Sequence, residues 1–267
     1  MITADKSKCI KCGACINDCV VKILTRDHND YPYMPQELEK FCLNCQHCLA
    51  VCPEGAITCN GITAGQCAPI GKTPSPDEML NLIRQRRSVR RYVNENIPAE
   101  TMELLKKSLH WTATGCNDRG LIFKVIDNKE DMNFFRRTAA DMLKKLFKWK
   151  ILQLLYPNVN RFLLEILNGE DVIFRNAPHM VICAVSQKSP CKEADPFIAL
   201  SNFDLMTQSC NIGTCWCGFA VYAMKFSRKM QKYLNLPKNY KIASVMLFGK
   251  SAVSYKRSTA PQEFEVL

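Results

Sequence analysis

The chain has 267 residues, with 47% hydrophobic and 23% charged residues, a composition that excludes wholesale disorder and suits one large or two modest domains. Its net charge of +11 would suit nucleic-acid binding, but no helix-turn-helix, RNP or zinc-finger pattern accompanies that charge. No apolar run is long enough to span a membrane, and the first residues, MITADKSKC, lack the apolar core of a secretory signal, so we expect a cytoplasmic chain.

Two runs near the N-terminus contain eight of the sixteen cysteines. Residues 9–19 read CIKCGACINDC and residues 42–53 read CLNCQHCLAVCP, so both runs have the spacing C-x2-C-x2-C-x3-C. A reducing cytoplasm keeps such thiols from forming disulfides. Thiols at fixed short spacings therefore predict metal binding.

The spacing predicts two [4Fe-4S] clusters. Two-residue gaps let three thiolates converge on one cubane, while the fourth cysteine of each run ligates the other cluster. The expected ligand sets are Cys9, Cys12, Cys15 with Cys52, and Cys42, Cys45, Cys48 with Cys19. A pair of zinc sites is the alternative, because C-x2-C also suits tetrahedral zinc. Two complete four-cysteine runs exceed what zinc needs, so the pattern favours iron–sulfur.

The doubled run resembles the bacterial two-cluster ferredoxin module, over residues 1–60. The repeat continues past the cysteines, with CVVKILTRD after one run and CPEGAITCN after the other. Val20 stands where that family usually has proline, at a position that shapes a turn but donates nothing to iron. Residues 61–76, rich in glycine and proline, predict an irregular linker. Cys59 and Cys67 fit neither run, so we expect free thiols.

Residues 77–267 form the expected second domain, which begins with a helix after Ser75-Pro76. The basic turn that follows contains Arg86, Arg87, Ser88 and Arg90. Arginines beside a hydroxyl can bind a phosphate in a bidentate way. Taken alone, the same charges also fit a solvated surface.

Several apolar segments follow. Residues 112–126 and 174–185 each predict a turn that leads into a strand, and residues 242–249 predict a last strand. Residues 195–218 predict a helix that ends at Gly213 and is followed by a tight turn. Its expected apolar positions are Phe197, Leu200, Phe203 and Met206. Helices interleaved with about four strands indicate an α+β fold.

Over residues 78–260 the chain resembles the nitroreductase family of FMN-dependent oxidoreductases. The matching motifs are RRSVRRY with Ile97-Pro98, a Thr-Ala-Thr-Gly-x-Asn turn at 112–117, Ala177-Pro178 before a strand, and GTCWCG at 213–218. The resemblance implies a central mixed sheet flanked by helices and an intertwined homodimer with FMN at its interface. The whole chain is similar to ferredoxin–nitroreductase fusions of anaerobic microbes.

The resemblance also implies FMN contacts from four segments. They are Arg86, Arg87, Ser88 and Arg90 in the basic turn, Thr114 and Asn117 reaching the partner's flavin, the backbone of Trp216, Cys217 and Gly218 near N5, and Lys256 with Arg257 at the phosphate. No side-chain base or nucleophile is required, so no catalytic residue is assigned. Residues 118–121, Asn211 and Gln262 depart from the family pattern, which affects the substrate cavity and one end of the phosphate site.

The remaining features have simpler interpretations. Residues 141–167 alternate lysines with large apolar residues and predict either an amphipathic membrane-surface helix or an excursion that packs over the flavin, which we favour. The four histidines match no metal-binding or catalytic pattern. We expect a set of core thiols: Cys116, Cys183, Cys191, Cys210 and Cys215. Cys217 lies close enough to the expected flavin loop for a redox role.

The sequence therefore predicts an FMN-dependent oxidoreductase in which two [4Fe-4S] clusters relay electrons to FMN for reduction of a small acceptor, such as a nitroaromatic or a quinone. An external low-potential donor would supply the clusters, and neither nucleic acid nor membrane is an expected partner. One alternative is a ferredoxin-type electron-transfer protein without substrate-reducing activity. The other is a nucleic-acid-responsive iron–sulfur sensor.

Overall fold

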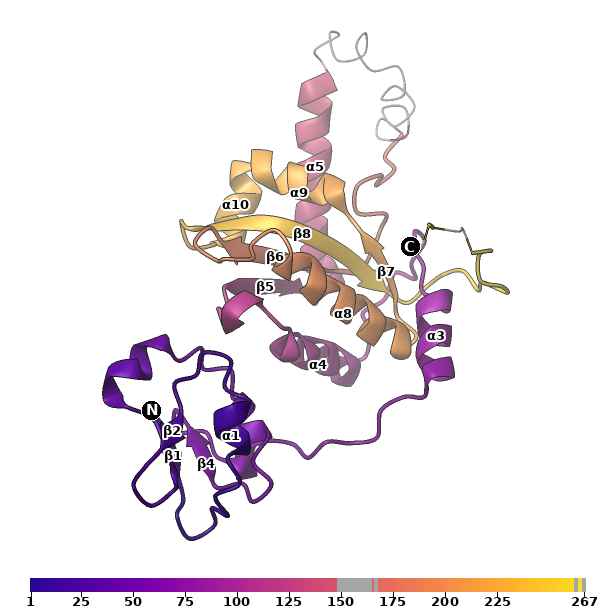
Figure 1. The fold of residues 1–267 in the computed structure, drawn as a ribbon. Coiled ribbons are helices and arrows are strands. Elements are labelled where there is room, and N and C mark those ends of the chain that lie inside the picture. The colour runs from indigo at the N-terminus through magenta and orange to yellow at the C-terminus, as the bar shows by residue number, and fades with distance from the viewer. Residues whose placement is uncertain (148–164, 166–167, 262–263, 266–267) are drawn as a thin grey trace. The chain divides into compact units, whose positions relative to one another are not determined.

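The computed structural model of the protein describes residues 1–147, 165, 168–261 and 264–265 (Figure 1). The chain divides into two compact units. The first consists of Met1–Thr73 with Cys116–Asp118, and the second of Pro74–Gly115 with Arg119–Leu267.

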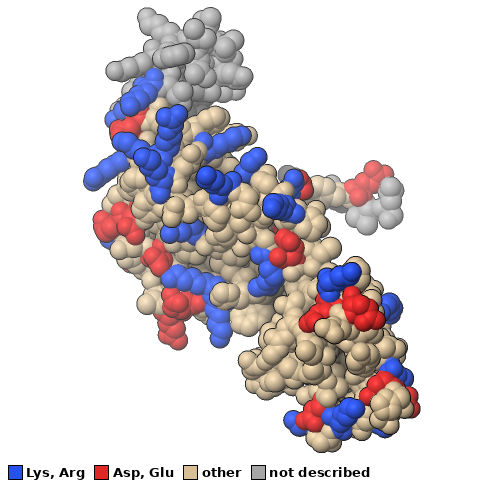
Figure 2. All heavy atoms as spheres, turned by 90° about the vertical axis from the view of Figure 1, so that its left-hand side faces the viewer, with Lys and Arg blue, Asp and Glu red and all other residues tan. Residues whose placement is uncertain are grey.

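The two parts of the sequence differ in charge. Residues 1–73 contain seven Lys and Arg and seven Asp and Glu, so the whole net charge of +11 belongs to residues 74–267. Figure 2 shows both signs mixed on the first unit, whereas Lys and Arg outnumber Asp and Glu on the visible face of the second unit. The basic character of the protein is a property of its second unit.

Short elements build the first unit. Strand β1 (Ile2–Ala4) pairs antiparallel with β4 (Ile57–Cys59), and β2 (Thr25–Arg26) pairs with β3 (Pro32–Tyr33). Each cysteine run contains a one-turn helix, which is α1 (Ala14–Asn17) in one run and α2 (His47–Ala50) in the other. The sequence repeat is therefore also a repeat in structure.

The buried cluster of the first unit is small. Its buried members are Ile2, Cys15, Ile23, Leu24, Met34, Cys48, Leu49, Ile57 and Cys59. Of the largest fully buried side chains in the described residues, Ile57 alone belongs to this unit. Three of the nine cluster members are cysteines, so apolar burial alone contributes little to the stability of this unit.

Helix α3 (Pro76–Gln85) opens the second unit as the sequence predicts. The Ser75 hydroxyl accepts a hydrogen bond from the Glu78 amide (3.2 Å), and the Glu78 carboxylate accepts one from the Ser75 amide (2.7 Å). This capping box, with Pro76 in the first turn, satisfies amides that a helix start leaves unpaired. The helix ends at Gln85 because Arg86 is extended (φ −60°, ψ 135°).

A four-stranded sheet forms the centre of the second unit. Its order is β5 (Leu121–Ile126), β6 (His179–Ser186), β8 (Tyr240–Gly249), β7 (Gly213–Trp216). All three pairings are antiparallel. Within the described residues, the parallel component of the expected mixed sheet is a single bridge between Ser88 and Thr214. The α+β expectation is confirmed.

Helices cover both faces of this sheet (Figure 1). Helices α4 (Ala99–Ser108) and α8 (Asp195–Ser209) lie on one face. Helices α5 (Lys129–Phe147), α9 (Gly218–Phe226) and α10 (Arg228–Leu234) lie on the other.

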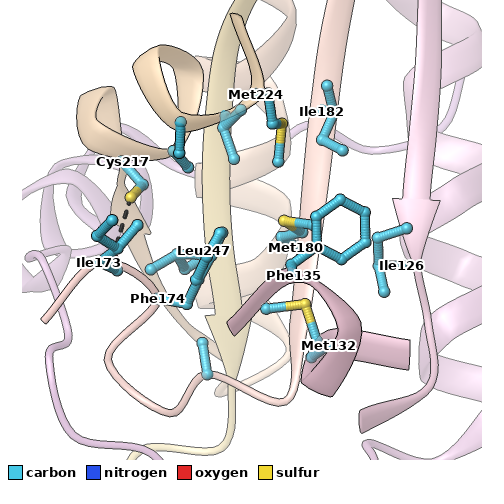
Figure 3. Close-up of a cluster of buried hydrophobic side chains, with 14 of the residues drawn as sticks. Ile126, Met132, Phe135, Ile173, Phe174, Met180, Ile182, Cys217, Met224 and Leu247 are labelled. Carbon is cyan, nitrogen blue, oxygen red and sulfur yellow. Dashed lines mark hydrogen bonds between the residues drawn. The ribbon is translucent and has the colours of Figure 1, made fainter. Parts of the chain in front are cut away.

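Two hydrophobic cores result from the alternation of side chains along the strands. In β6, Met180 and Ile182 join the core beneath α5 and α9 (Figure 3). Val181 and Cys183 join the core beneath α4 and α8. Burial of β6 on both faces explains why all eight of its residues are buried.

Three expectations need correction. Helix α8 ends at Ser209, not at Gly213, because Asn211 adopts a left-handed conformation (φ 58°) and turns the chain into strand β7. Phe197 is 51% exposed and Cys116 is also exposed, so neither is a core residue. Of the other expected core thiols, Cys183 and Cys215 are buried, whereas Cys191 and Cys210 are half-buried.

Within the described residues, no helix is both long and apolar enough to cross a membrane. Helix α5 accounts for the beginning of the segment 141–167. The rest of that expectation lies outside the described residues, apart from Glu165.

Candidate functional site

Five thiols line one hollow of the first unit. They are Cys19, Cys42, Cys45, Cys48 and Cys59. Four of the five form the second of the expected ligand sets, in which Cys19 comes from the first run. Burial raises the pKa of the Cys48 thiol to about 12, so a metal would have to displace its proton.

The other ligand set is also drawn from both runs. Burial raises the pKa of Cys15, whose thiol lies within electrostatic reach of Cys52 and Cys9. The Cys52 sulfur accepts a hydrogen bond from the Ala56 amide (3.2 Å), a contact of the kind that would influence the potential of a cluster bound there. The structure therefore brings Cys52 to the first run and Cys19 to the second. The remaining thiol of the set, Cys12, is exposed.

The chemistry of this donor set fits iron–sulfur clusters. The hollow is lined by thiols, apolar side chains, Gln46 and His47, without lysine, arginine or carboxylate. Among the described residues, no three His, Cys, Asp or Glu side chains converge tightly enough for a single metal ion. A cubane takes one thiolate on each of its four irons, so its ligands are spread around the cluster.

In the second unit, the basic turn lies beside strand β7. The Val89 amide donates to the Thr214 carbonyl (2.7 Å), which makes the bridge between Ser88 and Thr214. A Cβ on Gly213 would lie 2.5 Å from Val89 Cγ2, so this close approach requires glycine. Because the segment is extended, successive side chains point to opposite sides.

On one side, Ser88 and Arg90 line a hollow of about 330 Å³. Its walls also include Trp216, Cys217 and Gly218. Five of the sequence-predicted cofactor residues, from two distant segments, therefore meet here. The hollow opens at the N-terminus of α9, where the helix dipole favours negative charge.

On the other side, Arg87 lines a hollow of about 580 Å³ together with Lys256 and Arg257. Arg84 contributes a fourth cation. The Arg87 guanidinium donates to the Arg257 carbonyl (2.8 Å) and lies 4.4 Å from the centre of the Tyr255 ring. The structure thus brings the predicted C-terminal basic pair to the predicted basic turn.

Arg86 lines neither hollow. Its guanidinium pairs with the carboxylate of Asp204 on α8 at 3.1 Å, and this carboxylate, which is 5% exposed, also accepts a hydrogen bond from the Thr214 hydroxyl. Asp204 therefore connects the basic turn to helix α8 and strand β7. No sequence motif pointed to Asp204, which lies 118 positions from Arg86.

Arg175 is a residue of the Ser88 hollow that sequence reasoning missed. Arg175 and Asn176 have left-handed backbones (both φ 53°). The Asp171 carboxylate accepts from the amides of Phe174 (2.8 Å) and Asn176 (3.0 Å). These bonds fix the loop that presents Arg175.

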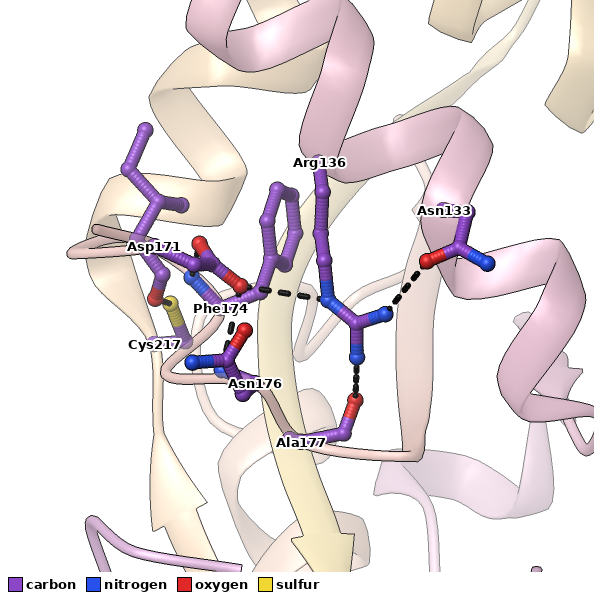
Figure 4. A network of polar contacts seen from close by, with 8 residues as sticks. Asn133, Arg136, Asp171, Phe174, Asn176, Ala177 and Cys217 are labelled. Atoms are coloured by element: carbon purple, nitrogen blue, oxygen red, sulfur yellow. Dashed lines mark hydrogen bonds and ion pairs between the residues drawn. The ribbon is translucent and has the colours of Figure 1, made fainter. Parts of the chain in front are cut away.

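Arg136 of α5 anchors the same loop (Figure 4). Its guanidinium donates to the Asp171 carboxylate (3.2 Å), to the Ala177 carbonyl (2.6 Å) and to the Asn133 side chain (2.8 Å). Among the described residues, no carboxylate pairs with Arg175 itself. Its charge is available to the hollow.

Cys217 is buried, and its thiol donates to the Ile173 carbonyl (3.2 Å). Burial raises its pKa to about 11. The thiol is therefore protonated at neutral pH, whereas nucleophilic and redox-active cysteines react as thiolates. This environment argues against a redox role for Cys217.

Two predicted contacts lie apart from both hollows. Thr114 lines a third hollow of about 500 Å³ with Arg119 and Lys106, and its hydroxyl accepts a hydrogen bond from the Arg119 amide (3.0 Å). Asn117 has a left-handed backbone (φ 51°) and lines none of these hollows. Both residues were expected to reach the flavin of a partner subunit rather than that of their own chain.

A larger cavity of about 980 Å³ lies along α9, α10 and β8. It shares Trp216, Cys217, Gly218 and Tyr222 with the Ser88 hollow. Apolar side chains such as Val221, Leu234 and Ile242 dominate its lining, which suits an apolar molecule.

Residues 83–250, more than half of the chain, match the sequence model of the nitroreductase family. The chain belongs to the nitroreductase family. The Ser88 hollow lies entirely inside this match, and more than half of the residues that line the Arg87 hollow do so too. The N-terminal residues 8–57 match the model of a 4Fe-4S dicluster domain, so the first unit is an iron–sulfur domain.

Solved structures of nitroreductases share the fold of the second unit. A nitroreductase with bound FMN from Bacteroides fragilis has 19% identity and a TM-score of 0.56, covering 71% of this chain and 98% of that one. A nitroreductase with bound FMN from Desulfitobacterium hafniense has 20% identity and a TM-score of 0.57, covering 70% of this chain and 97% of that one. An FMN-dependent nitroreductase from Clostridium difficile has 16% identity and a TM-score of 0.56, covering 72% of this chain and 100% of that one. Comparison with curated proteins finds no match.

Proposed function

We propose that this nitroreductase-family protein is an FMN-dependent oxidoreductase in which two [4Fe-4S] clusters relay electrons to FMN for reduction of a small acceptor, such as a nitroaromatic compound or a quinone. The observation that carries the proposal is the pair of hollows on the two sides of residues 87–90. The FMN held by the fold relatives from Bacteroides fragilis and Desulfitobacterium hafniense supports it.

The hollow of Arg87, Lys256 and Arg257 would hold the FMN phosphate. Its side chains supply positive charge and few apolar contacts, which suits a dianionic group. Arg86, whose guanidinium is held by Asp204, would add charge from beside this hollow.

The hollow of Ser88 and Arg90 would hold the flavin ring. Arg90 and Arg175 place two guanidinium groups on its wall, and the N-terminus of α9 adds a favourable dipole. When bound there, FMN would supply the redox chemistry, and the protein's part is to position the ring and to stabilise its negative charge. Trp216, Cys217 and Gly218 line the same wall, and the Cys217 amide donates to the Val245 carbonyl (2.9 Å) rather than into the hollow.

No side chain has to act as an acid, base or nucleophile in this proposal. The protonated Cys217 thiol would serve as packing against the Ile173 carbonyl. An aromatic acceptor would enter through the larger apolar cavity that shares Trp216 and Tyr222 with the ring hollow.

The cysteine residues of the first unit would hold the clusters in two crossed sets. These sets are Cys9, Cys12, Cys15 with Cys52, and Cys42, Cys45, Cys48 with Cys19, and the five-thiol hollow supports the second of them. Clusters bound in this way supply one-electron transfer.

A homodimer is part of the proposal. Phe219, Tyr222 and Phe226 are 62%, 63% and 71% exposed, and their spacing places them on one side of α9. An exposed apolar stripe beside a binding hollow indicates a covering partner. A second copy would cover it and bring Thr114 and Asn117 to the neighbouring FMN.

FMN affinity of the full chain tests the proposal. Arg87→Ala and Arg90→Ala should each weaken FMN binding about tenfold to hundredfold, because a charged hydrogen-bond pair contributes about 1.5–3 kcal/mol. Lys229→Ala is the matched control, since it removes one positive charge from an exposed residue of α10. Both cluster and flavin content are measured after anaerobic purification.

Two results would contradict the proposal. Failure of the wild-type chain to retain or bind FMN would remove the flavin site. FMN binding without reduction of any nitroaromatic or quinone would favour the ferredoxin-type electron-transfer alternative.

A further inference from the structure

The five-thiol hollow holds one thiol more than a cubane takes. Cys19, Cys42, Cys45 and Cys48 are its proposed ligands, and Cys59 lines the same hollow. A [4Fe-4S] cluster takes four cysteine thiolates, one on each iron. The fifth thiol therefore needs a different explanation.

The backbone around Cys59 fixes its side chain in this position. Cys59 ends strand β4 and pairs with Ile2 of β1. The amides of Cys59 and Ile62 each donate to the other's carbonyl (both 2.9 Å), across a turn at Asn60 and Gly61. In β4, residues 57 and 59 point inward while residue 58 is half-buried, so the strand alternation directs the Cys59 thiol to the interior, where it is 1% exposed.

The immediate neighbours of this thiol are groups of the cluster site. The Cys59 thiol donates a hydrogen bond to the side-chain oxygen of Asn44 (3.8 Å), and it lines the same hollow as the Cys48 thiol. Asn44 stands between two proposed ligands, Cys42 and Cys45. Cys59 also belongs to the buried apolar cluster of the first unit, so it borders both that core and the proposed cluster site.

The sequence repeat shows that only one of the two cysteine runs is followed by a cysteine at the position of Cys59. Aligning CVVKILTRD with CPEGAITCN places Arg26 at the position that corresponds to Cys59. Arg26 is exposed, and its guanidinium donates to the carbonyls of Lys11 and Asp30 (both 3.2 Å). The two cysteine runs thus have the same spacing, but the residue that follows at this equivalent position is a buried cysteine in one half of the repeat and an exposed arginine in the other.

We propose that Cys59 is not a ligand and that, when a cluster fills this hollow, the Cys59 S–H turns from Asn44 to the sulfur atoms around the second cluster and raises the reduction potential of that cluster alone. The proposal rests on the ligand sets given under the proposed function. Hydrogen bonds to cluster sulfurs stabilise the more negative reduced state and are one of the protein's means of setting the potential.

The test is an EPR-monitored redox titration of the full chain with both clusters. Cys59→Ala should keep iron and sulfide at the wild-type level. It should shift the oxidised-to-reduced equilibrium of one cluster about three- to tenfold toward the oxidised form, which for one electron is about 30–60 mV to lower potential. The other cluster should not change. Cys59→Ser, which keeps a donor, should restore at least part of the shift.

Two further variants provide a control and a replacement for Cys59→Ala in the redox titration. Cys67→Ala removes an exposed thiol outside both runs and should leave both potentials unchanged. Cys59→Val fills the space of the thiol without a donor, and it carries the same test where Cys59→Ala fails to fold.

Three results would overturn the proposal, and they are distinguishable. Unchanged potentials in Cys59→Ala and Cys59→Val would reduce Cys59 to a core residue. Loss of one cluster in both Cys59→Ala and Cys59→Ser, with the other retained, would make Cys59 a ligand and replace one member of the proposed set. A wild-type chain that binds fewer than two clusters would contradict the ligand sets themselves.

Discussion

The two units of the protein are stabilised by different means. In the first unit, a third of the small buried cluster is cysteine, and the strands are two or three residues long. In the second unit, a four-stranded sheet separates two cores that contain Phe135, Phe174, Phe203 and Phe248. The first unit therefore depends on what its thiols bind, whereas the second depends on apolar burial.

Removing iron should have the largest effect on the folding of the protein, and it tests whether the two units are stabilised by different means. A chelator applied to the reduced full chain should unfold the first unit, because metal binding and folding are coupled in small metal-binding domains. The second unit should stay folded. Proteolysis within residues 1–73 reports on the first unit, and tryptophan fluorescence reports on the second, since all three tryptophans (111, 149 and 216) lie beyond residue 73.

A first unit that resists proteolysis equally with and without iron would contradict the contrast. So would a loss of the tryptophan signal on chelation alone.

Two adjacent leucines of α4 test whether the stability of the second unit depends on apolar burial. Leu105 is fully buried and Leu104 is 45% exposed. Leu105→Ala should lower the unfolding free energy of the second unit by about 2–5 kcal/mol, because it leaves a cavity in a packed core. Leu104→Ala should change it by about 0.5 kcal/mol or less. Denaturant titration followed by tryptophan fluorescence measures both, and similar losses for the two variants would argue against a packed core.

A buried histidine gives the second unit a pH dependence. His179 is fully buried, and its Nε2 accepts a hydrogen bond from the Ile97 amide (3.1 Å). Burial lowers the pKa of His179 to about 4, below its value of about 6.5 in an unfolded chain. The unfolded state therefore binds more protons, and the stability of the second unit should fall by about 3 kcal/mol as pH drops from 6.5 to 4.

Denaturant titrations of the wild type and of His179→Gln across this pH range check that expectation. Glutamine keeps an acceptor for the Ile97 amide but cannot titrate, so the variant should lose most of the pH dependence. An equal dependence in both proteins would assign the effect to other groups.

Local patterns in the sequence were sufficient to predict many of the helices and strands of this structure. Cysteine spacing located both runs, and the strand predicted after the turn within 174–185, the strand 242–249 and the helix after Ser75 appear where their patterns predicted them. Strand β7 was missed because its four residues resembled a turn between Gly213 and Gly218. A strand that short is recognised only from its pairing with β8.

The residues missed at the site depend on contacts between distant segments. Arg175 belongs to no motif, and its loop is fixed by Arg136 from another helix. Asp204 is an unremarkable helical residue until α8 places it beside Arg86. Cys59 is a free thiol, as expected, but no sequence pattern indicated that the pairing of β4 with β1 would place it in the hollow of the second run.

The rate of flavin reduction tests most directly whether the two units work together. Stopped-flow absorbance of bound FMN is followed in the full chain and in Cys15→Ser/Cys48→Ser, which removes one proposed ligand from each cluster. With dithionite, both proteins should reduce FMN. With a reduced ferredoxin as donor, the proposed relay predicts rapid reduction in the wild type and its loss in the variant. Equal rates with the ferredoxin donor would contradict the relay and leave the first unit without a part in the reaction.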